Sequence, residues 1–331
     1  MSIINTIKKE LSNNSFKKPL IVFAEGWNPI IQEAASTLKN EGIIEPLLIF
    51  RTIEEFSNSN NVSNVKNIIL NQNDLSKYAN FLYELRKEKG MTLEEANKLV
   101  LQPNYMCSLI VKLGEADGAI CGIEYTTKDT LRPALQIIKT SKESKIVSSI
   151  LILEKNDETL FYSDVSLVID PTAEELANIT DNAVKFVEKD LELVNNKVAM
   201  LSYSTNGSGA GASVDKVKQG YEIYKNTFAN KYTKTDVFGE IQFDAAYVDS
   251  VRSKKAPNLN WNSGANVYIF PQIDSGNISY KMMQRCGGYE VTGPIIIGLD
   301  KPVNDLSRGA GLYEVVSLSY ITALQALKKS Q

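Results

Sequence analysis

In this 331-residue chain, a serine and an arginine that are adjacent in the sequence are the most specific candidates for catalytic chemistry. Ser307 and Arg308 occur in the segment KPVNDLSRG, residues 301–309, which ends on a glycine. An arginine presents a planar fork that can hold two phosphate oxygens, and a serine hydroxyl adds a further donor. The segment therefore indicates an anion site, although a surface turn with a solvated arginine would explain these residues equally well.

Two further arginines stand near the expected ends of helices. Arg132 lies in the first turn of a helix that Thr130 can cap, and Arg285 ends a helix just before Gly287 and Gly288. An arginine near a helix C-terminus also serves the helix dipole without any ligand. Several arginines beside strand ends nevertheless predict a pocket for a small anion, in a chain whose formal net charge is −3.

A glycine-rich segment, NGSGAGAS at residues 206–213, lies between an expected strand and an expected helix. Its glycines let a ligand approach the backbone, and the helix N-terminus offers unpaired N–H groups to an anion. No Gly-Lys-Ser or Gly-Lys-Thr follows, so a nucleoside-triphosphate loop is excluded, and the alternating glycines do not fit the dinucleotide fingerprint. A flexible strand-to-helix turn is an equal alternative.

The chain contains no histidine, which removes whole classes of active site. Ser-His-Asp triads, Cys-His pairs and histidine metal sites are excluded, so acid–base chemistry would fall to carboxylates, lysine, tyrosine or cysteine. The cysteines, Cys107, Cys121 and Cys286, form no C-x-x-C pair. We interpret them as reduced thiols of a cytoplasmic protein, and neither as a disulfide framework nor as a zinc site.

The charge and hydropathy of the chain exclude two classes of binding partner. The chain has 36 Lys and Arg against 39 Asp and Glu, so it lacks the basic excess that binding to nucleic acid needs. Apolar runs are too short for a membrane span, and the N-terminal residues lack the apolar core of a signal peptide. The sequence thus predicts a protein that binds neither nucleic acid nor membrane.

Short apolar runs alternate with longer helical patterns, which is typical of an α/β protein with mainly parallel sheets. At this length two domains are the default expectation. A polar segment at 140–145 and the Gly-Pro pair at 293–294 divide the chain into a first domain, residues 1–142 plus 294–331, and a second domain, residues 143–293. The expected strands are 20–24, 46–50, 118–121, 148–153, 198–204 and 267–270, and the expected helices are 28–41, 93–101, 105–112, 131–140, 172–191, 213–224, 277–285 and 312–328.

Six segments, in the same order along the chain, resemble the phosphate acetyltransferase (phosphotransacetylase) family. The similarity runs from about residue 20 to about residue 326, and KPVNDLSRG is its most specific motif. The other motifs are DTLRPALQIIKT at 129–140, PTAEELA at 171–177, LSYSTNGSG at 201–209, IQFDAA at 241–246 and the SGN…YK…QR…GG pattern at 275–288.

The resemblance implies two α/β domains, the second inserted into the first, with the active site in the cleft between them. It implies a cytoplasmic homodimer that uses no metal and no cofactor, with coenzyme A as a substrate. The implied reaction converts acetyl-CoA and phosphate to acetyl phosphate and CoA, reversibly and without a covalent enzyme intermediate. A base takes the proton from the CoA thiol, and the thiolate attacks the carbonyl of acetyl phosphate.

Carried over by position, Ser307 and Arg308 match the catalytic Ser-Arg pair of the family. Arg308 would polarise the carbonyl or phosphoryl oxygen, and Ser307 would donate to the developing charge. Glu314 stands where similar proteins carry an aspartate that acts as the base, so the carboxylate is kept on a side chain one methylene longer. The expected substrate-binding residues are Arg132, Arg285, Arg86, Thr130 and Tyr280, and the expected CoA or phosphate loop contains Gly207, Ser208 and Gly209.

Other positions depart from the family pattern. Asn206 and Ala210 replace two lysines that are common in the glycine-rich loop, and Tyr125 replaces a usual histidine. The missing cations predict weaker contacts to the CoA phosphates, with the chemistry intact. The alternatives are a phosphate butyryltransferase-like enzyme, because sequence does not show the volume of the acyl pocket, and a catalytically weak CoA-binding member. A nicotinamide dehydrogenase would need a fingerprint that the chain lacks.

Overall fold

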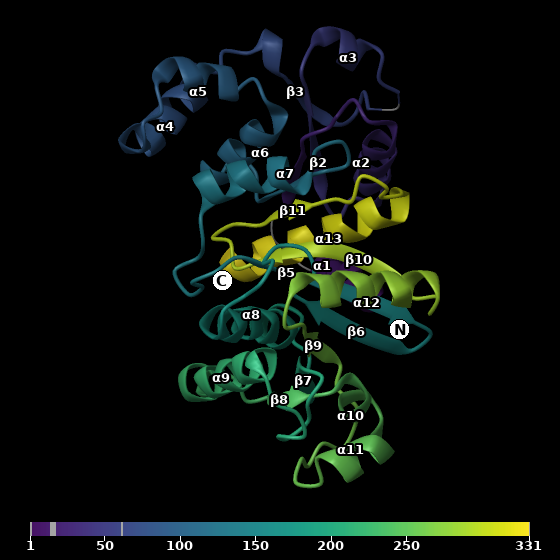
Figure 1. Ribbon diagram of the computed structural model, residues 1–331. Coiled ribbons are helices and arrows are strands. Elements are labelled where there is room, and N and C mark those ends of the chain that lie inside the picture. The colour runs from purple at the N-terminus through teal and green to yellow at the C-terminus, as the bar shows by residue number, and fades with distance from the viewer. Residues whose placement is uncertain (1, 14–17, 61, 331) are drawn as a thin grey trace. The chain divides into compact units, whose positions relative to one another are not determined.

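The computed structural model describes residues 2–13, 18–60 and 62–330 of the chain. The chain forms two compact units, each with its own sheet (Figure 1). Unit 1 comprises Ile3–Ser141 and Leu299–Gln331, and unit 2 comprises Lys142–Gly298. None of the helices in the described part of the chain is long and apolar enough to span a membrane.

Unit 1 is built on a sheet of five parallel strands in the order β11-β4-β1-β2-β3. Its central strands are almost fully buried, as expected of parallel strands that are covered on both faces. In the register, Phe23 pairs with Ile120 and Asp305 pairs with Cys121, so the carboxyl ends of β1, β4 and β11 lie level. The strands are β1 (Leu20–Phe23), β2 (Glu45–Phe50), β3 (Lys66–Ile69), β4 (Gly118–Cys121) and β11 (Val303–Asp305).

The helices of unit 1 begin and end where the sequence supplies caps. The side chain of Asn28 accepts a hydrogen bond from the N–H of Ile30 at 2.9 Å and begins α2, which ends at Gly42 with φ 71°. The last helix, α13, packs against α1, α2 and β4. The helices are α1 (Ile3–Asn13), α2 (Pro29–Glu41), α3 (Ile53–Ser57), η1 (Leu70–Gln72), α4 (Ser76–Arg86), η2 (Lys87–Lys89), α5 (Leu93–Leu99), α6 (Pro103–Lys112), α7 (Thr127–Pro133), η3 (Ala134–Ile138) and α13 (Leu312–Ser330).

Unit 2 contains a six-stranded sheet in the order β10-β5-β6-β9-β7-β8. β5 is antiparallel to both of its neighbours, and the other pairs are parallel. The strands are β5 (Ser148–Lys155), β6 (Glu158–Ser163), β7 (Asn196–Leu201), β8 (Thr235–Ile241), β9 (Val267–Ile269) and β10 (Glu290–Ile297). The helices are α8 (Ala173–Lys185), η4 (Phe186–Asp190), α9 (Ala212–Thr227), η5 (Ala229–Lys231), α10 (Phe243–Tyr247), α11 (Asp249–Lys255) and α12 (Ile273–Arg285).

Aromatic rings fill part of the core of unit 2. The Tyr162 ring lies 5.5 Å from that of Tyr268 and 5.0 Å from that of Phe270, with tilted or edge-on geometry. Tyr280 and Met283 of α12 pack against this cluster from the outside. α8 and α9 pack against each other (Figure 1), and α8 contacts β5, β6 and β9.

The α/β class with mainly parallel sheets is confirmed, and each of the six expected strands is present within a few residues of its expected position. β3, β6, β8, β10 and β11 were not predicted. β3 and β11 are short, and β3 is partly exposed, so neither carries a long apolar run. The Gly293-Pro294 pair lies inside β10, where the register with β5 shifts, because a proline without an N–H interrupts the pairing without ending the strand.

Candidate active site

The strand order of the unit 1 sheet changes direction between β1 and β4, a position where parallel sheets often bind ligands. The chain proceeds from β1 to β2 and β3 on one side, whereas β4 and β11 lie on the other side of β1. The order therefore reverses between β1 and β4, and open parallel sheets bind ligands outside the carboxyl ends of strands at such a point. Glu25, Gly122 and Asp305 stand at or just beyond the ends of β1, β4 and β11 respectively.

Glu25 is a buried acid that the sequence analysis did not single out. Its Oε1 accepts hydrogen bonds from the N–H groups of Gly122 at 2.7 Å and Glu124 at 3.4 Å, while its Oε2 has no hydrogen-bond partner. Burial raises the pKa of Glu25 to about 7, and the bonds from the backbone N–H groups offset part of this effect. The available signal was an acid two residues after the apolar strand LIVF, since a charged residue there has little access to water.

Asp305 is a second buried acid at this edge of the sheet. Burial raises the pKa of its carboxyl group to about 6, and the hydroxyls of Thr127 and Thr130 lower it in part. Thr130, predicted to contact substrate, is fully buried, so its hydroxyl is directed to the protein interior. Neither Asp305 Oδ1 nor Thr130 Oγ1 has a partner at hydrogen-bond geometry.

The predicted catalytic pair lies in the loop between β11 and α13, residues 306–311, here called the Ser307–Arg308 loop, in which Leu306 and Ala310 are buried. Ser307 Oγ accepts a weak hydrogen bond from the N–H of Gly309 at 3.3 Å, and both Ser307 and Arg308 are exposed to solvent. Glu314 stands in the first turn of α13, and its Oε2 accepts a hydrogen bond from the N–H of Gly311 at 2.7 Å. The carboxylate at 314 thus satisfies a backbone donor at the start of the helix, as in a capping box.

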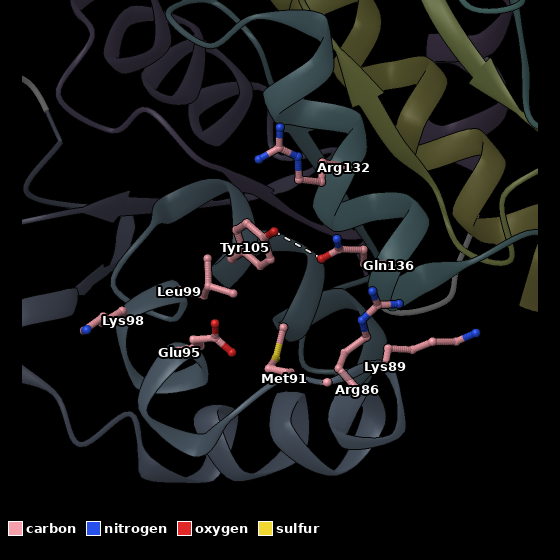
Figure 2. Close-up of a pocket in the computed structure, with 10 residues that line it drawn as sticks. Arg86, Lys89, Met91, Glu95, Lys98, Leu99, Tyr105, Arg132 and Gln136 are labelled. Atoms are coloured by element: carbon pink, nitrogen blue, oxygen red, sulfur yellow. Dashed lines mark hydrogen bonds between the residues drawn. The ribbon is translucent and has the colours of Figure 1, made fainter.

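A cavity of about 480 Å³ in unit 1 brings together two of the predicted substrate-binding residues, Arg86 at the end of α4 and Arg132 on α7 (Figure 2). Four cations and a single carboxylate, Glu95, line it, so its charge favours an anion. The Nε of Arg86 is buried and has no hydrogen-bond partner, so this guanidinium has spare donor capacity. The lining residues are Arg86, Lys89, Gly90, Met91, Glu95, Lys98, Leu99, Tyr105, Arg132 and Gln136.

The remaining predicted site residues belong to unit 2. Arg285 is the exposed last residue of α12, and Tyr280 of the same helix packs against the aromatic core. Gly207, Ser208 and Gly209 lie in the turn between β7 and α9.

The backbone of the glycine-rich turn is already hydrogen-bonded within unit 2. The N–H of Gly207 donates to Oε1 of the buried Glu240 at 2.8 Å, and the N–H of Gly209 donates to Ser204 Oγ at 2.9 Å. Ser204 Oγ itself donates to the same Glu240 oxygen at 2.8 Å. A phosphate could therefore reach the N–H groups of Gly207 and Gly209 only if these bonds were exchanged.

The whole chain is similar to proteins of a known family. Residues 2–323 match the family described as "Phosphate acetyl/butaryl transferase". The chain is 46% identical to the phosphate acetyltransferase of Mycoplasma pneumoniae, over 99% of this chain and 100% of the relative, and 44% identical to that of Mycoplasma genitalium over the same shares. A phosphotransacetylase structure from Streptococcus pyogenes superimposes with a TM-score of 0.89 at 38% identity, covering 99% of both chains.

Glu25→Gln should stabilise the protein more as the pH rises. Because the folded pKa is about 7 and the ordinary value 4.5, the charged form costs nothing below about pH 4.5 and its full penalty above about pH 7. Gln keeps an acceptor for Gly122 and carries no charge, so its stability relative to the parent should rise by up to about 3 kcal/mol between these limits. Urea unfolding at pH 5 and pH 8 measures this, with the exposed Glu33→Gln as control. A pH-independent difference would show that Glu25 is not held neutral.

Proposed function

The chain belongs to this phosphate acyltransferase family, and we propose that it acts as a phosphate acetyltransferase, moving an acetyl group reversibly between coenzyme A and inorganic phosphate. The observation that carries the proposal is that relatives at 46% and 44% identity, matched over their whole length, are phosphate acetyltransferases. The cation-lined cavity and the exposed residues Ser307 and Arg308 support it, because both substrates are anions.

The chemistry that we propose is direct transfer. The thiolate of CoA attacks the carbonyl carbon of acetyl phosphate, the C–O bond to phosphate breaks, and phosphate leaves. Arg308 holds the oxygen on which negative charge develops, and Ser307 donates a hydrogen bond to it. Glu314 takes the thiol proton, and no metal or cofactor takes part.

We assign the anionic parts of the substrates to the arginines. Arg86 and Arg132 line one cavity, where Lys89 and Lys98 add charge, so this cavity suits a phosphate of CoA. Arg285, Tyr280 and the loop of Gly207, Ser208 and Gly209 complete the proposed substrate-binding set, whereas Thr130 is fully buried and is not part of it. We place the reaction in the cytoplasm.

The acyl length preference is tested by CoA-dependent release of phosphate from acetyl, propionyl and butyryl phosphate at equal concentrations. Acetyl phosphate should react fastest, and Arg308→Ala should lower that rate by about 10²–10³ because one donor to the developing charge is lost. CoA binding, measured by calorimetry, should change little in this variant. A faster rate with butyryl phosphate would favour the butyryltransferase alternative, and no CoA-dependent release from any of them would identify a silent CoA-binding member.

Two variants of Glu314 separate its capping bond from its proposed role as base. Gln offers Gly311 the same kind of oxygen acceptor, so Glu314→Gln should leave unfolding by urea nearly unchanged. Activity should nevertheless fall by about 10²–10⁴, and the loss should shrink as the pH rises towards the pKa of the CoA thiol, because thiolate then forms without a base. Glu314→Asp should keep substantial activity. A Gln variant within threefold of the parent at neutral pH would mean that the proton leaves by another route.

We also propose a homodimer whose interface lies on residues 146–291. On α12, Ile278 and Met282 stand four residues apart, on one face of the helix, and each is 58% exposed. Ile278→Glu with Met282→Glu should shift light scattering at micromolar concentration from dimer to monomer, because a charge cannot be buried there without a partner. Leu101→Glu, at a 52% exposed apolar residue of unit 1 outside residues 146–291, is the matched control. A parent that is monomeric and fully active would contradict the assembly.

A further inference from the structure

Asp305 lies between two segments of unit 1 to which the proposed function assigns residues, the Ser307–Arg308 loop and α7. It ends β11, and the Ser307–Arg308 loop follows directly. Its carboxyl group faces the hydroxyls of Thr127 and Thr130 on α7, the helix that also carries Arg132. α7 and β11 are in contact.

We propose that Asp305 is a positioning residue for acyl transfer, whose ionised carboxylate accepts hydrogen bonds from Thr127 and Thr130. These bonds fix α7, and with it Arg132, relative to the Ser307–Arg308 loop. The inference rests on the proposed function and deepens it, since it names a residue that acts through others and does not touch the substrate.

The carboxyl group of Asp305 is packed closely against the chain that follows β4. Gly122 adopts φ 114°, and a Cβ built there would overlap Asp305 Oδ1 and would lie 2.6 Å and 2.7 Å from the backbone O and N of Leu306. The N–H of Leu306 donates to the carbonyl of Cys121 at 2.7 Å, which holds this turn against β4. The chain after β4 therefore presses directly on the carboxyl group, and only glycine fits at that position.

Two buried polar atoms lie unsatisfied at this point. Asp305 Oδ1 and Thr130 Oγ1 both have no hydrogen-bond partner, although the two groups are close enough to interact. Buried polar atoms without partners are rare in folded proteins, and hydrogen bonds at catalytic sites often tighten only when substrate is bound. A direct Thr130–Asp305 bond would satisfy both atoms and would draw α7 towards the Ser307–Arg308 loop.

The surroundings of Asp305 make its charge sensitive to pH. Burial raises its pKa to about 6, and the groups that lower this pKa are the two hydroxyls of Thr127 and Thr130, not cations. From β4, Cys121 interacts electrostatically with both Asp305 and Glu25. On α7, Lys128 and Arg132 are exposed to solvent.

Polar groups on the two helices that contact β11 are bonded to other residues. Asp129 of α7 accepts a bond from Thr126 at 2.7 Å. From α13, Thr322 and Gln325 engage the neighbouring Asn304 at 2.8 Å each. The ionised form of Asp305 is therefore reached only as the pH rises through about 6.

Steady-state kinetics of Asp305→Asn and Thr130→Val from pH 5 to pH 8 test the proposal. Each variant should lower kcat by about 10-fold to 100-fold, because positioning acts on the reacting geometry, and should also raise KM for CoA, because α7 carries Arg132. The parent should gain activity through about pH 6, and the Asn variant should lack this rise. The double variant should be no worse than Asp305→Asn alone, since both substitutions act on the same Thr130–Asp305 bond. Asp300→Asn, an exposed acid of unit 1 that pairs with Lys112, is the control and should match the parent.

A folding readout separates this inference from the proposed function. The folded pKa of about 6 against an ordinary 3.8 means that the parent loses stability as the pH rises between these values. Asp305→Asn should thus gain up to about a hundredfold in the folding constant relative to the parent between pH 4 and pH 7. Asn activity within threefold of the parent with the same pH profile, or independent effects of the two substitutions, would overturn the positioning role. A parent without any CoA-dependent phosphate release would instead overturn the proposed function, while the folding readout would still report on the carboxyl group.

Discussion

At the carboxyl edge of the unit 1 sheet the chain leaves no room for a side chain at Gly122, and the geometry of the candidate site depends on this. The N–H of Gly122 is bonded to Glu25, and its Cα faces Asp305 and the Leu306 backbone. A side chain at this position would push β11 and the Ser307–Arg308 loop away from β4. The absence of a Cβ therefore allows β1, β4 and β11 to end level, with the buried acids Glu25 and Asp305 both next to Gly122.

Because of this packing, two acids of unit 1 are buried, while the arginines of the candidate site keep groups that are free to bind a ligand. The two acids at the carboxyl ends of the strands are buried, and burial holds the pKa of Glu25 near 7 and that of Asp305 near 6. Arg308 and Arg132 are on the surface, and Arg86 has a buried nitrogen without a partner. Because the inner acids do not neutralise these arginines through ion pairs among the described residues, the guanidinium groups keep their capacity to bind an anion.

The sequence predicted what depends on local pattern and missed what depends on contacts between distant segments. The strand LIVF and the helix capped by Asn28 follow from apolar runs and caps, and both are present. The common cavity of Arg86 and Arg132 could not be read from positions 46 residues apart, since only the packing of α4 against α6 and of α6 against α7 brings them together. Glu25 was missed because no periodic pattern distinguishes a buried acid after a strand from a solvated one in a turn.

The glycine-rich turn of unit 2 lies between a strand and a helix, as expected from the sequence, but its backbone N–H groups are bonded within the protein. Its alternating glycines indicated an open anion site, yet Glu240 supplies an internal anion that holds the N–H of Gly207, with Lys218 at 3.8 Å. This internal carboxylate keeps the turn ordered without a ligand, while the loop positions 206 and 210 carry Asn and Ala and add no positive charge. A CoA phosphate at this turn would have to compete with Glu240 without the help of those cations, so most of the electrostatic attraction for the phosphates of CoA should come from the four cations of the unit 1 cavity.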